Sequence, residues 1–171
     1  MEHINSYDEL IKKITTFINE IGISCMPGNL TEDTFLPGID IKDGKMIYDT
    51  RLLKHPGDLL HDAGHLAVLL PHDRAVAQSP DQLKGDLDEG GSEMATICWS
   101  WAAMYHLNLE AEVLFHPYGY KDGSEALKIA FSSGSYIGLP LLQWFGMTKE
   151  PGKNISQEDV VFPNMKYWLR K

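Results

Sequence analysis

Two histidines, His61 and His65, stand four residues apart within the run from residue 58 to residue 70. In a helix this spacing places both side chains on one face, one turn apart, so that both imidazoles can reach a single metal ion. Asp62 adds a carboxylate between them. The run therefore predicts a helix over residues 58–70 with a metal-binding face, and His61 and His65 are the predicted ligands.

The rest of this run is almost entirely apolar. It contains Leu59, Leu60, Leu66, Val68, Leu69 and Leu70. A helix that is apolar nearly all round is buried, and polar groups within it need partners. The alternative interpretation is a pair of structural histidines on a half-buried helix. Because Asp58 and Asp62 crowd the same side as the histidines, we favour metal binding, with Pro71 ending the helix.

Length, charge and cysteine content limit the other function classes. The 171 residues suit a single domain, 1–171, that is large enough to bury a core. A net charge of −9 opposes nucleic-acid binding, which depends on phosphate neutralisation by Lys and Arg. No apolar run approaches the roughly 18 residues of a membrane span, and residues 1–5 lack the features of a signal peptide. Cys25 and Cys98 form no CxxC pair, which favours a reducing cytoplasm and argues against a cysteine-based zinc site.

The N-terminal third predicts one helix and one hairpin. Ser6 and Glu9 have the spacing of a capping box, apolar residues follow at helical spacing, and Gly22 stops the helix. A linker rich in Pro and Gly leads to alternating apolar residues around Asp43-Gly44, a hairpin signal. The second strand, residues 45–49, would offer an edge for substrate. We expect a mainly α (α+β) fold, a helical bundle around the metal-site helix with a short β-hairpin at one edge.

A second apolar helix is predicted over residues 93–107, opened by Gly90-Gly91-Ser92. Glu93 would lie in its first turn, where the helix dipole favours a carboxylate whether or not it binds metal. Glu93 is nevertheless our predicted third ligand, and Asp86 and Glu89 just upstream are alternative carboxylates. The stretch from residue 71 to residue 91 reads as a long surface connection with at most a short helix, of the kind that can gate a site.

The C-terminal half predicts further short helices. A helical turn is expected at 109–115, a helix capped by Ser124 through about residue 131, an apolar segment at 136–147 broken by Pro140, and a terminal helix at 163–170. Between the first two lies the loop of residues 116–123, which is dense in aromatic and titratable residues. Loops of this kind place side chains over a site held by rigid helices.

The central third of the chain resembles the zincins, zinc-dependent peptidases that carry His-Glu-x-x-His on a helix after an edge strand. In their gluzincin branch the following helix donates a glutamate as third ligand. The order of the 45–49 strand, His61 and His65, then Glu93 is similar. Asp62 replaces the general-base glutamate of that family, and because aspartate is one methylene shorter, this departure affects peptidase activity more than metal binding.

The resemblance implies a zinc-dependent hydrolase, peptidase- or amidase-like, acting on a small-molecule or peptide substrate. Two imidazoles and one carboxylate leave an open position on the metal, as catalytic sites do. Asp62 would accept or orient the proton of the attacking water. His116, Tyr118 or Tyr120 would stabilise an oxyanion. Asp58 would hold His61 or His65 through its other ring nitrogen, and Glu89 is a further supporting carboxylate.

Three alternatives stay open. Two histidines and a carboxylate also describe the non-haem iron(II) oxygenases, and Leu36-Pro37, the strand at Ile47 and His61–His65 resemble the order found in elongation factor P hydroxylases; Fe²⁺ or Mn²⁺ could then replace Zn²⁺. His61-Asp62 also resembles the signature of the HD phosphohydrolases, although His3 and His55 are poorly placed as the earlier histidine of that family. The third alternative is a non-catalytic metal-binding or partner-binding protein. The oligomeric state does not follow from the sequence.

Overall fold

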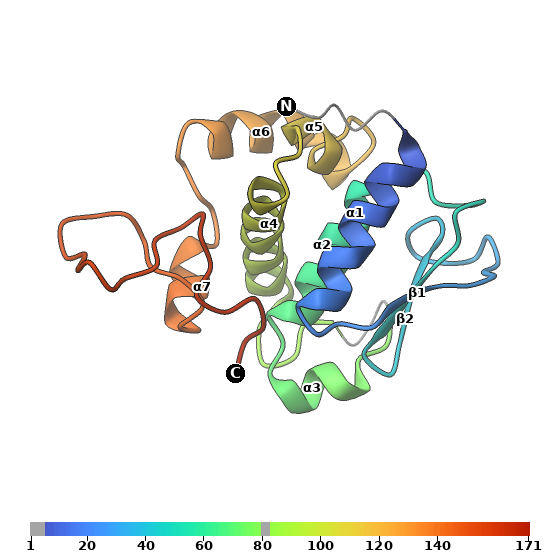
Figure 1. Cartoon of the computed structure of the whole chain (residues 1–171), viewed down its shortest axis with the longest axis horizontal. Helices are drawn as coiled ribbons and strands as arrows, with labels where there is room; N and C mark the ends of the chain where they lie inside the picture. Colours follow the sequence, from blue (N-terminus) through green and yellow to red (C-terminus); the bar gives the residue numbers. More distant parts are fainter. Residues whose placement is uncertain (1–5, 80–82) are drawn as a thin grey trace.

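A computed structural model describes residues 6–79 and 83–171, and most of its regular structure is helical (Figure 1). A small three-stranded sheet lies along one side of the helices. The mainly α, α+β expectation is confirmed at this level. His3, considered above for an HD-type site, lies outside the described residues, as does part of the predicted surface connection, residues 80–82.

The first helix, α1 (Tyr7–Glu20), forms as predicted. The Ser6 side chain accepts a hydrogen bond from the Glu9 backbone N–H at 3.1 Å. One face is buried, comprising Ile11, Ile14, Phe17 and Ile18, and it packs against α2 (Gly57–Ala67). Gly22 follows with a φ of +104°, the left-handed conformation that ends many helices.

The sheet contains the predicted hairpin and one additional strand. β2 (Ile39–Lys42) and β3 (Lys45–Tyr48) are antiparallel around Asp43 and Gly44, whose φ angles of 49° and 69° suit a tight hairpin turn. β1 (Cys25–Pro27), from the predicted linker, pairs in parallel with β3. The strand order is β1-β3-β2. β3 is therefore the central strand, and the prediction that it offers a free edge to substrate is wrong.

The histidine-bearing helix is shorter than predicted. α2 ends at Ala67 instead of Leu70, and Pro71 begins α3 (Pro71–Val76), where its fixed φ and missing N–H suit the first helical position. The last carbonyls of α2 have other donors. Arg74 Nε donates to Leu66 O at 2.9 Å, and the backbone N–H of Arg170 donates to Ala67 O at 2.9 Å. These donors compensate for the helical bonds that a longer helix would have made.

The second long helix, α4 (Glu89–His106), begins four residues before the predicted start. Its N-cap is Asp88, whose side chain accepts from Gly91 N–H at 2.6 Å. α4 makes the most extensive helix–helix contact of the described fold, against α2. Gly64 of α2 lies at this contact, where a β-carbon would lie only 3.0 Å from Ser100 Oγ and 3.1 Å from Thr96. The missing side chain thus permits close approach of the two helices.

The C-terminal half contains α5 (Ala111–Leu114), a 3₁₀ turn η1 (Tyr120–Asp122), α6 (Ser124–Ser132) and α7 (Leu139–Trp144). Pro140 does not break its segment but occupies the first turn of α7. Ser124 is the first residue of α6 rather than its cap, and its hydroxyl donates to Gly119 O at 3.2 Å.

No helix forms at residues 163–170, contrary to prediction. This segment instead pairs with other elements. Trp99 Nε1 of α4 donates to Trp168 O at 2.9 Å, and Arg74 Nη2 donates to Arg170 O at 2.7 Å. Of the four side chains expected to dock on the body, Met165, Trp168 and Leu169 pack against the core, whereas Tyr167 is exposed. Tertiary hydrogen bonds therefore replace helical ones in the tail.

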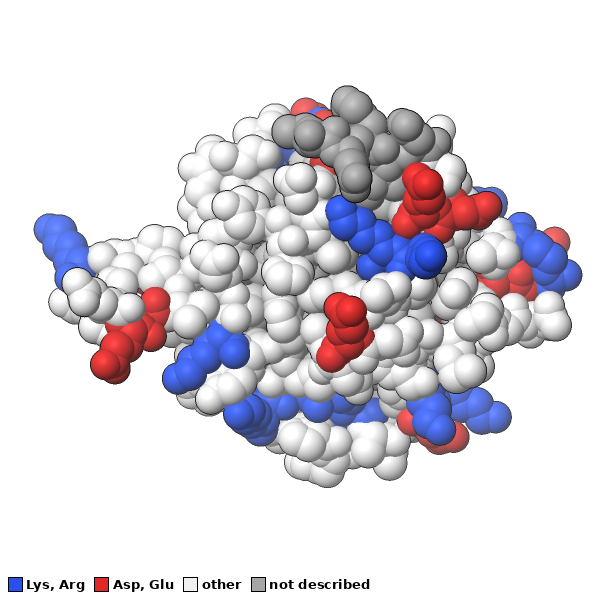
Figure 2. Space-filling view, in the orientation of Figure 1, with Lys and Arg blue, Asp and Glu red and all other residues white. Residues whose placement is uncertain are grey.

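Within the described residues, no helix is both long and apolar enough to cross a membrane. On the face drawn in Figure 2, several basic side chains follow one another along the lower edge, and acidic and basic side chains are intermixed elsewhere.

Candidate metal centre

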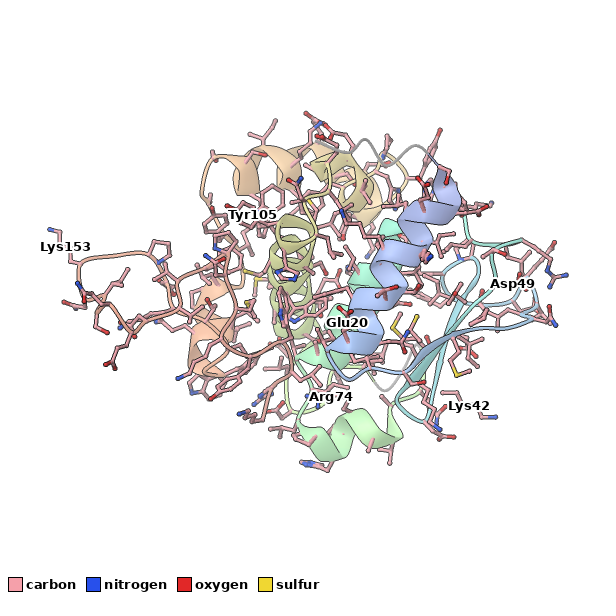
Figure 3. The ribbon with its side chains drawn as sticks, viewed as in Figure 1. Glu20, Lys42, Asp49, Arg74, Tyr105 and Lys153 are labelled. Carbon is pink, nitrogen blue, oxygen red and sulfur yellow. The ribbon has the colours of Figure 1, made fainter. Side chains whose placement is uncertain are left out.

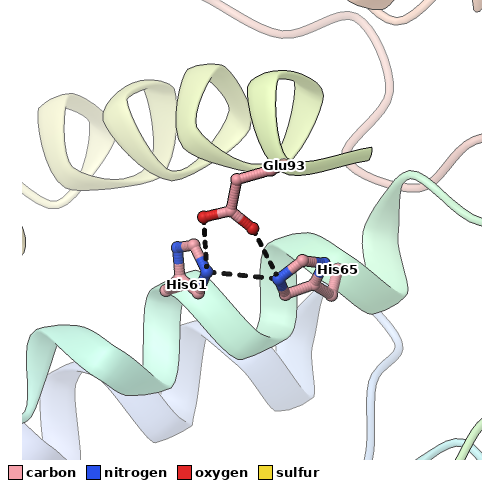
Figure 4. Close-up of side chains that lie close together, drawn as sticks. All are labelled: His61, His65 and Glu93. Atoms are coloured by element: carbon pink, nitrogen blue, oxygen red, sulfur yellow. Dashed lines mark hydrogen bonds and ion pairs between the residues drawn. The ribbon is translucent and has the colours of Figure 1, made fainter. Parts of the chain in front are cut away.

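The two helices α2 and α4 bring three potential ligands together (Figure 4). His61 Nε2 and His65 Nε2 lie 3.1 Å apart on α2. The carboxylate of Glu93 reaches down from α4, with Oε1 3.3 Å from His61 Nε2 and Oε2 3.3 Å from His65 Nε2. These atoms belong to the group that sequence spacing predicted, His61, His65 and Glu93.

The position of Glu93 in the structure removes its simplest alternative explanation. Because α4 begins at Glu89 and is capped by Asp88, Glu93 lies in the second turn of the helix rather than the first. The field of a helix terminus falls off within its first turn. Glu93 is therefore placed to meet the two histidines, not to cap the helix.

The outer nitrogens of both imidazoles are held by hydroxyl groups. The Tyr120 hydroxyl lies 3.2 Å from His61 Nδ1, and Thr96 Oγ1 lies 3.2 Å from His65 Nδ1. A hydroxyl oxygen can accept a hydrogen bond from Nδ1–H, the tautomer that leaves the Nε2 lone pair free. Metal-bound histidines commonly have such a partner on their other nitrogen. Both rings thus present Nε2 to the same point.

The dimensions and chemistry of the group fit a bound cation. Ligands about 2.0–2.1 Å from a tetrahedral zinc ion are separated from one another by about 3.3 Å, close to the 3.1 and 3.3 Å separations here. The side chains of His61 and His65 are 14% and 15% exposed, while that of Glu93 is 44% exposed. The three ligands therefore remain open toward solvent on one side, as a catalytic site requires.

The electrostatics of Glu93 follow from this contact. Partial burial by itself would raise the pKa of its carboxyl, but the adjacent imidazoles of His61 and His65 together outweigh burial and hold that pKa well below its usual range. Glu93 is consequently a carboxylate at neutral pH, the form in which it can ligate a metal.

Asp62, the predicted base, lies beside the group but is not part of it. Its side chain is buried, and burial raises the pKa of its carboxyl to about 7, an effect that the nearby His65 partly opposes. No hydrogen bond to this carboxylate occurs within the described residues. The group found within the described residues consists of His61, His65 and Glu93 without Asp62, while the HD-type alternative stays a prediction.

Asp58 and His116 contact each other instead of the metal group. Asp58 Oδ1 accepts a hydrogen bond from His116 Nε2 at 2.7 Å. The prediction that Asp58 holds His61 or His65 therefore fails, because the loop after α5 brings a closer partner. The His116 ring stacks on His55 at 3.8 Å, and its Nδ1 is buried without a hydrogen-bond partner. Nε2 of His116 is thus engaged by Asp58, and the role of His116 as an oxyanion donor stays a prediction.

The remaining predicted residues have distinct positions. Tyr120 is brought to the group, but its hydroxyl lies on His61; burial, followed by the nearby Glu93 charge, raises its pKa. Tyr118 is 84% exposed at the cleft edge. Glu89, the first residue of α4, is exposed and lines the cleft without contacting the ligands. Asp86 binds Arg170 instead, at 2.7 Å.

Sequence reasoning missed Thr96, which holds His65. Thr96 follows Glu93 by three residues on α4 and so lies on the same helical face. That spacing was visible in the sequence. The partner of Thr96 was not visible in the sequence, because the relative position of α2 and α4 determines which imidazole nitrogen its hydroxyl meets.

The group opens into a cleft of about 1430 Å³. Its walls come from α2, α4, the loop before β2 and the loop of residues 116–123. The cleft is large compared with the roughly 300–1,000 Å³ of most small-molecule sites. A substrate can therefore reach the open side of the three ligands.

Comparisons with protein families, with curated proteins and with solved structures found no match to this chain. The likeness to zincins thus rests on the order and spacing of a few residues. Any assignment of activity depends on the chemistry of the site.

Proposed function

We propose that this protein is a metal-dependent hydrolase that binds Zn²⁺ through His61, His65 and Glu93 and cleaves an amide-type bond. The observation that carries the proposal is the convergence of two Nε2 atoms and a carboxylate while hydroxyl groups occupy both Nδ1 atoms. Structural histidines need no such shared orientation. The donor set of two nitrogens and one oxygen also accepts Fe²⁺ or Mn²⁺, so the metal is identified by the experiment below.

The chemistry divides between the metal and the chain. A bound Zn²⁺ ion supplies a Lewis acid that polarises a carbonyl and lowers the pKa of a coordinated water to about 7. His61, His65 and Glu93 would hold the ion, while Tyr120 and Thr96 would orient the imidazoles. The Asp62 carboxylate would take a proton from the attacking water and return it to the leaving amine as the C–N bond breaks. The products are a carboxylic acid and an amine.

The sheet favours an amidase over a peptidase that binds substrate as an added strand. β3 is paired on both sides. At the outer edge of β2, Ser79 N–H donates to Ile41 O at 2.9 Å. At the outer edge of β1, the Asn19 side chain bonds both backbone groups of Cys25. Strand addition needs free main-chain groups, and these positions are occupied.

Metal binding is tested by calorimetric titration of chelator-treated protein with Zn²⁺, Fe²⁺ under anaerobic conditions, and Mn²⁺. We expect one ion per chain, with loss of detectable binding in His61→Ala, His65→Ala and Glu93→Gln because each removes one of three ligands. His72→Ala is the matched control, since His72 is exposed outside the cleft. Absence of stoichiometric binding to the wild type, or unchanged binding in all three variants, would refute the site.

The role of Asp62 is tested by Asp62→Asn and Asp62→Glu in the metal-loaded protein. With a panel of small chromogenic amides as substrates, Asp62→Asn should lower kcat by about 100-fold or more and keep the metal, because Asp62 is not a ligand. Asp62→Glu keeps a carboxylate and should retain part of the turnover. Equal kcat in wild type and Asp62→Asn would exclude Asp62 as the base.

A further inference from the structure

The cleft around the metal group is lined by lysines that have no partner. Lys54, Lys84 and Lys121 line it and are exposed, and within residues 6–79 and 83–171 none of the three makes an ion pair or a side-chain hydrogen bond. Several basic side chains elsewhere, by contrast, are bound to carboxylates; examples are Arg51, Lys128, Lys149 and Arg170. Three free cations around one cleft are notable in a chain of net charge −9.

The acidic side chains of the same cleft are mostly engaged or buried. Asp58 is bonded to His116, and Glu93 to the two histidines. Asp62 is buried. Glu89 is exposed, and the Glu93 side chain is partly exposed. Among the described lining residues, the three lysines are accompanied by four carboxylates, Asp58, Asp62, Glu89 and Glu93, so a bound divalent cation would make the sum of their formal charges positive. Clefts with one sign of charge concentrate ligands of the opposite sign.

Two exposed aromatic rings flank these lysines. Phe35, from the loop before β2, is 74% exposed, and Tyr118, from the loop after α5, is 84% exposed. The Tyr118 ring stacks on His55 at 5.6 Å, and His55 stacks on His116. Apolar side chains of Leu83, Ile97 and Leu127 contribute to the walls. The cleft thus combines cationic groups with apolar and aromatic surface, the pattern of a ligand site.

From this combination we infer the substrate class of the proposed hydrolase: a compact amide that carries a carboxylate or phosphate group together with an aromatic or apolar portion. This inference rests on the proposed function for the cleavage step, while the anion recognition stands on the lysines alone. The occupied sheet edges agree with a compact substrate. The anionic group would lie among Lys54, Lys84 and Lys121, and the apolar portion against Phe35 or Tyr118.

The test measures binding without turnover, in chelator-treated protein, with three probes of similar size. Hippurate carries a carboxylate, phenyl phosphate carries a phosphate, and hippuramide is the neutral counterpart of hippurate. At low salt we expect one or both anions to bind at least about tenfold more tightly than hippuramide, and the difference to shrink in 0.5 M NaCl because salt screens exposed charges. The tighter anion identifies the group that the cleft prefers.

The lysines are tested by the triple variant Lys54→Gln, Lys84→Gln, Lys121→Gln. It should lose about tenfold or more in affinity for the anions and keep its affinity for hippuramide. The control removes three exposed lysines outside the cleft, in Lys42→Gln, Lys45→Gln, Lys153→Gln; Figure 3 labels Lys42 on the hairpin and Lys153 on the loop after α7. This control should bind like the wild type.

The aromatic portion is tested by Phe35→Ala with Tyr118→Ala, which should weaken all three probes to a similar extent. Equal binding of charged and neutral probes by the wild type, or equal loss in the cleft and control triple variants, would overturn the inference. Zinc titration of the same triple variant separates the two proposals. If the variant binds zinc but not the anions, both stand; if no protein binds zinc while the lysine effect persists, only the hydrolase proposal fails.

Discussion

The candidate metal centre depends on the orientation of single imidazole rings. The spacing of His61 and His65 in the sequence predicted that they share a helical face, because residues four apart lie about one turn apart on the same side of an α-helix. Spacing cannot say which ring nitrogen faces the partner helix. In the structure that choice is associated with the Tyr120 and Thr96 hydroxyls, each 3.2 Å from an Nδ1 atom.

Removal of either hydroxyl should weaken metal binding without unfolding the protein. In Tyr120→Phe and Thr96→Val the ring loses its partner, so part of the orientation is lost and zinc affinity should fall about tenfold in each variant. Calorimetric titration measures the effect, and circular dichroism checks the fold. Tyr105→Phe, at an exposed tyrosine labelled in Figure 3, is the control. Unchanged affinity in both variants would mean that the hydroxyls do not orient the ligands.

Residues whose partners come from distant loops were the least predictable. Asp58 lies on the histidine helix, one turn before the ligands, so sequence reasoning paired it with them. Its actual partner, His116, is 58 residues away in the chain. Local spacing contains no information about that loop, whereas Glu93 could be predicted because it lies near the start of an apolar helix that packs on α2.

At the scale of elements, the site is the contact between α2 and α4. Gly64, inside the histidine motif, meets Ser100 and Thr96 with no room for a larger side chain. Thr96 is also the residue that holds His65. The close approach of the helices and the orientation of a ligand therefore depend on the same contact.

A larger residue at position 64 should damage stability and metal binding together. Gly64→Val would insert an isopropyl group between the helices, which costs about 1–3 kcal/mol as overpacking and moves Glu93 away from the histidines. Urea unfolding and zinc titration measure the two effects. Gly152→Val is the control, because a β-carbon there meets nothing within 4 Å. If Gly64→Val kept both the stability and the zinc affinity of the wild type, the contact at Gly64 would not determine the geometry of the metal site.

Elements with strong local signals formed as predicted. The errors arose where tertiary contacts determine where a helix ends or whether a segment is helical. The capped helix α1 and the hairpin at Asp43-Gly44 have caps and turn residues within the element itself. The end of α2 and the tail at 163–170 contain no such caps or turn residues of their own. The end of α2 bonds to Arg74 and Arg170, and the tail bonds to Arg74 and Trp99, so each depends on residues outside itself. The apolar residues of the tail correctly predicted that it packs against the core. They did not predict that it does so without forming a helix.

At the scale of the molecule, the ion pair of Asp86 with Arg170 connects the tail, residues 163–170, to the segment before α4. Arg170 Nη1 lies 2.7 Å from Asp86 Oδ1, and Nη2 lies 2.9 Å from Oδ2. The hydrogen bonds from Arg170 lower the pKa of Asp86. The folded state therefore favours the ionised carboxylate, and its stabilising effect is complete above the unfolded pKa of about 3.9.

The stability difference between the wild type and Asp86→Asn should consequently depend on pH. At pH 7 the variant should be less stable by up to about 1 kcal/mol, since the carboxylate is partly solvated. As pH falls below about 4 toward the lowered folded pKa, the wild type loses this advantage and the difference shrinks. Urea unfolding at several pH values measures it. A difference that stays constant or grows in acid would contradict the assignment.

The docking of the tail has a consequence for the order of assembly during synthesis. Arg170 supplies a donor to Ala67 O, and Arg74 joins Leu66 O to Arg170 O. A nascent chain that has emerged only as far as α4 already contains all three proposed metal ligands, yet it lacks the residue that completes the end of the histidine helix. Ribosome-bound chains truncated before and after residue 170 should thus differ in protease resistance at α2, because the segment around residue 170 stabilises the helix that carries His61 and His65.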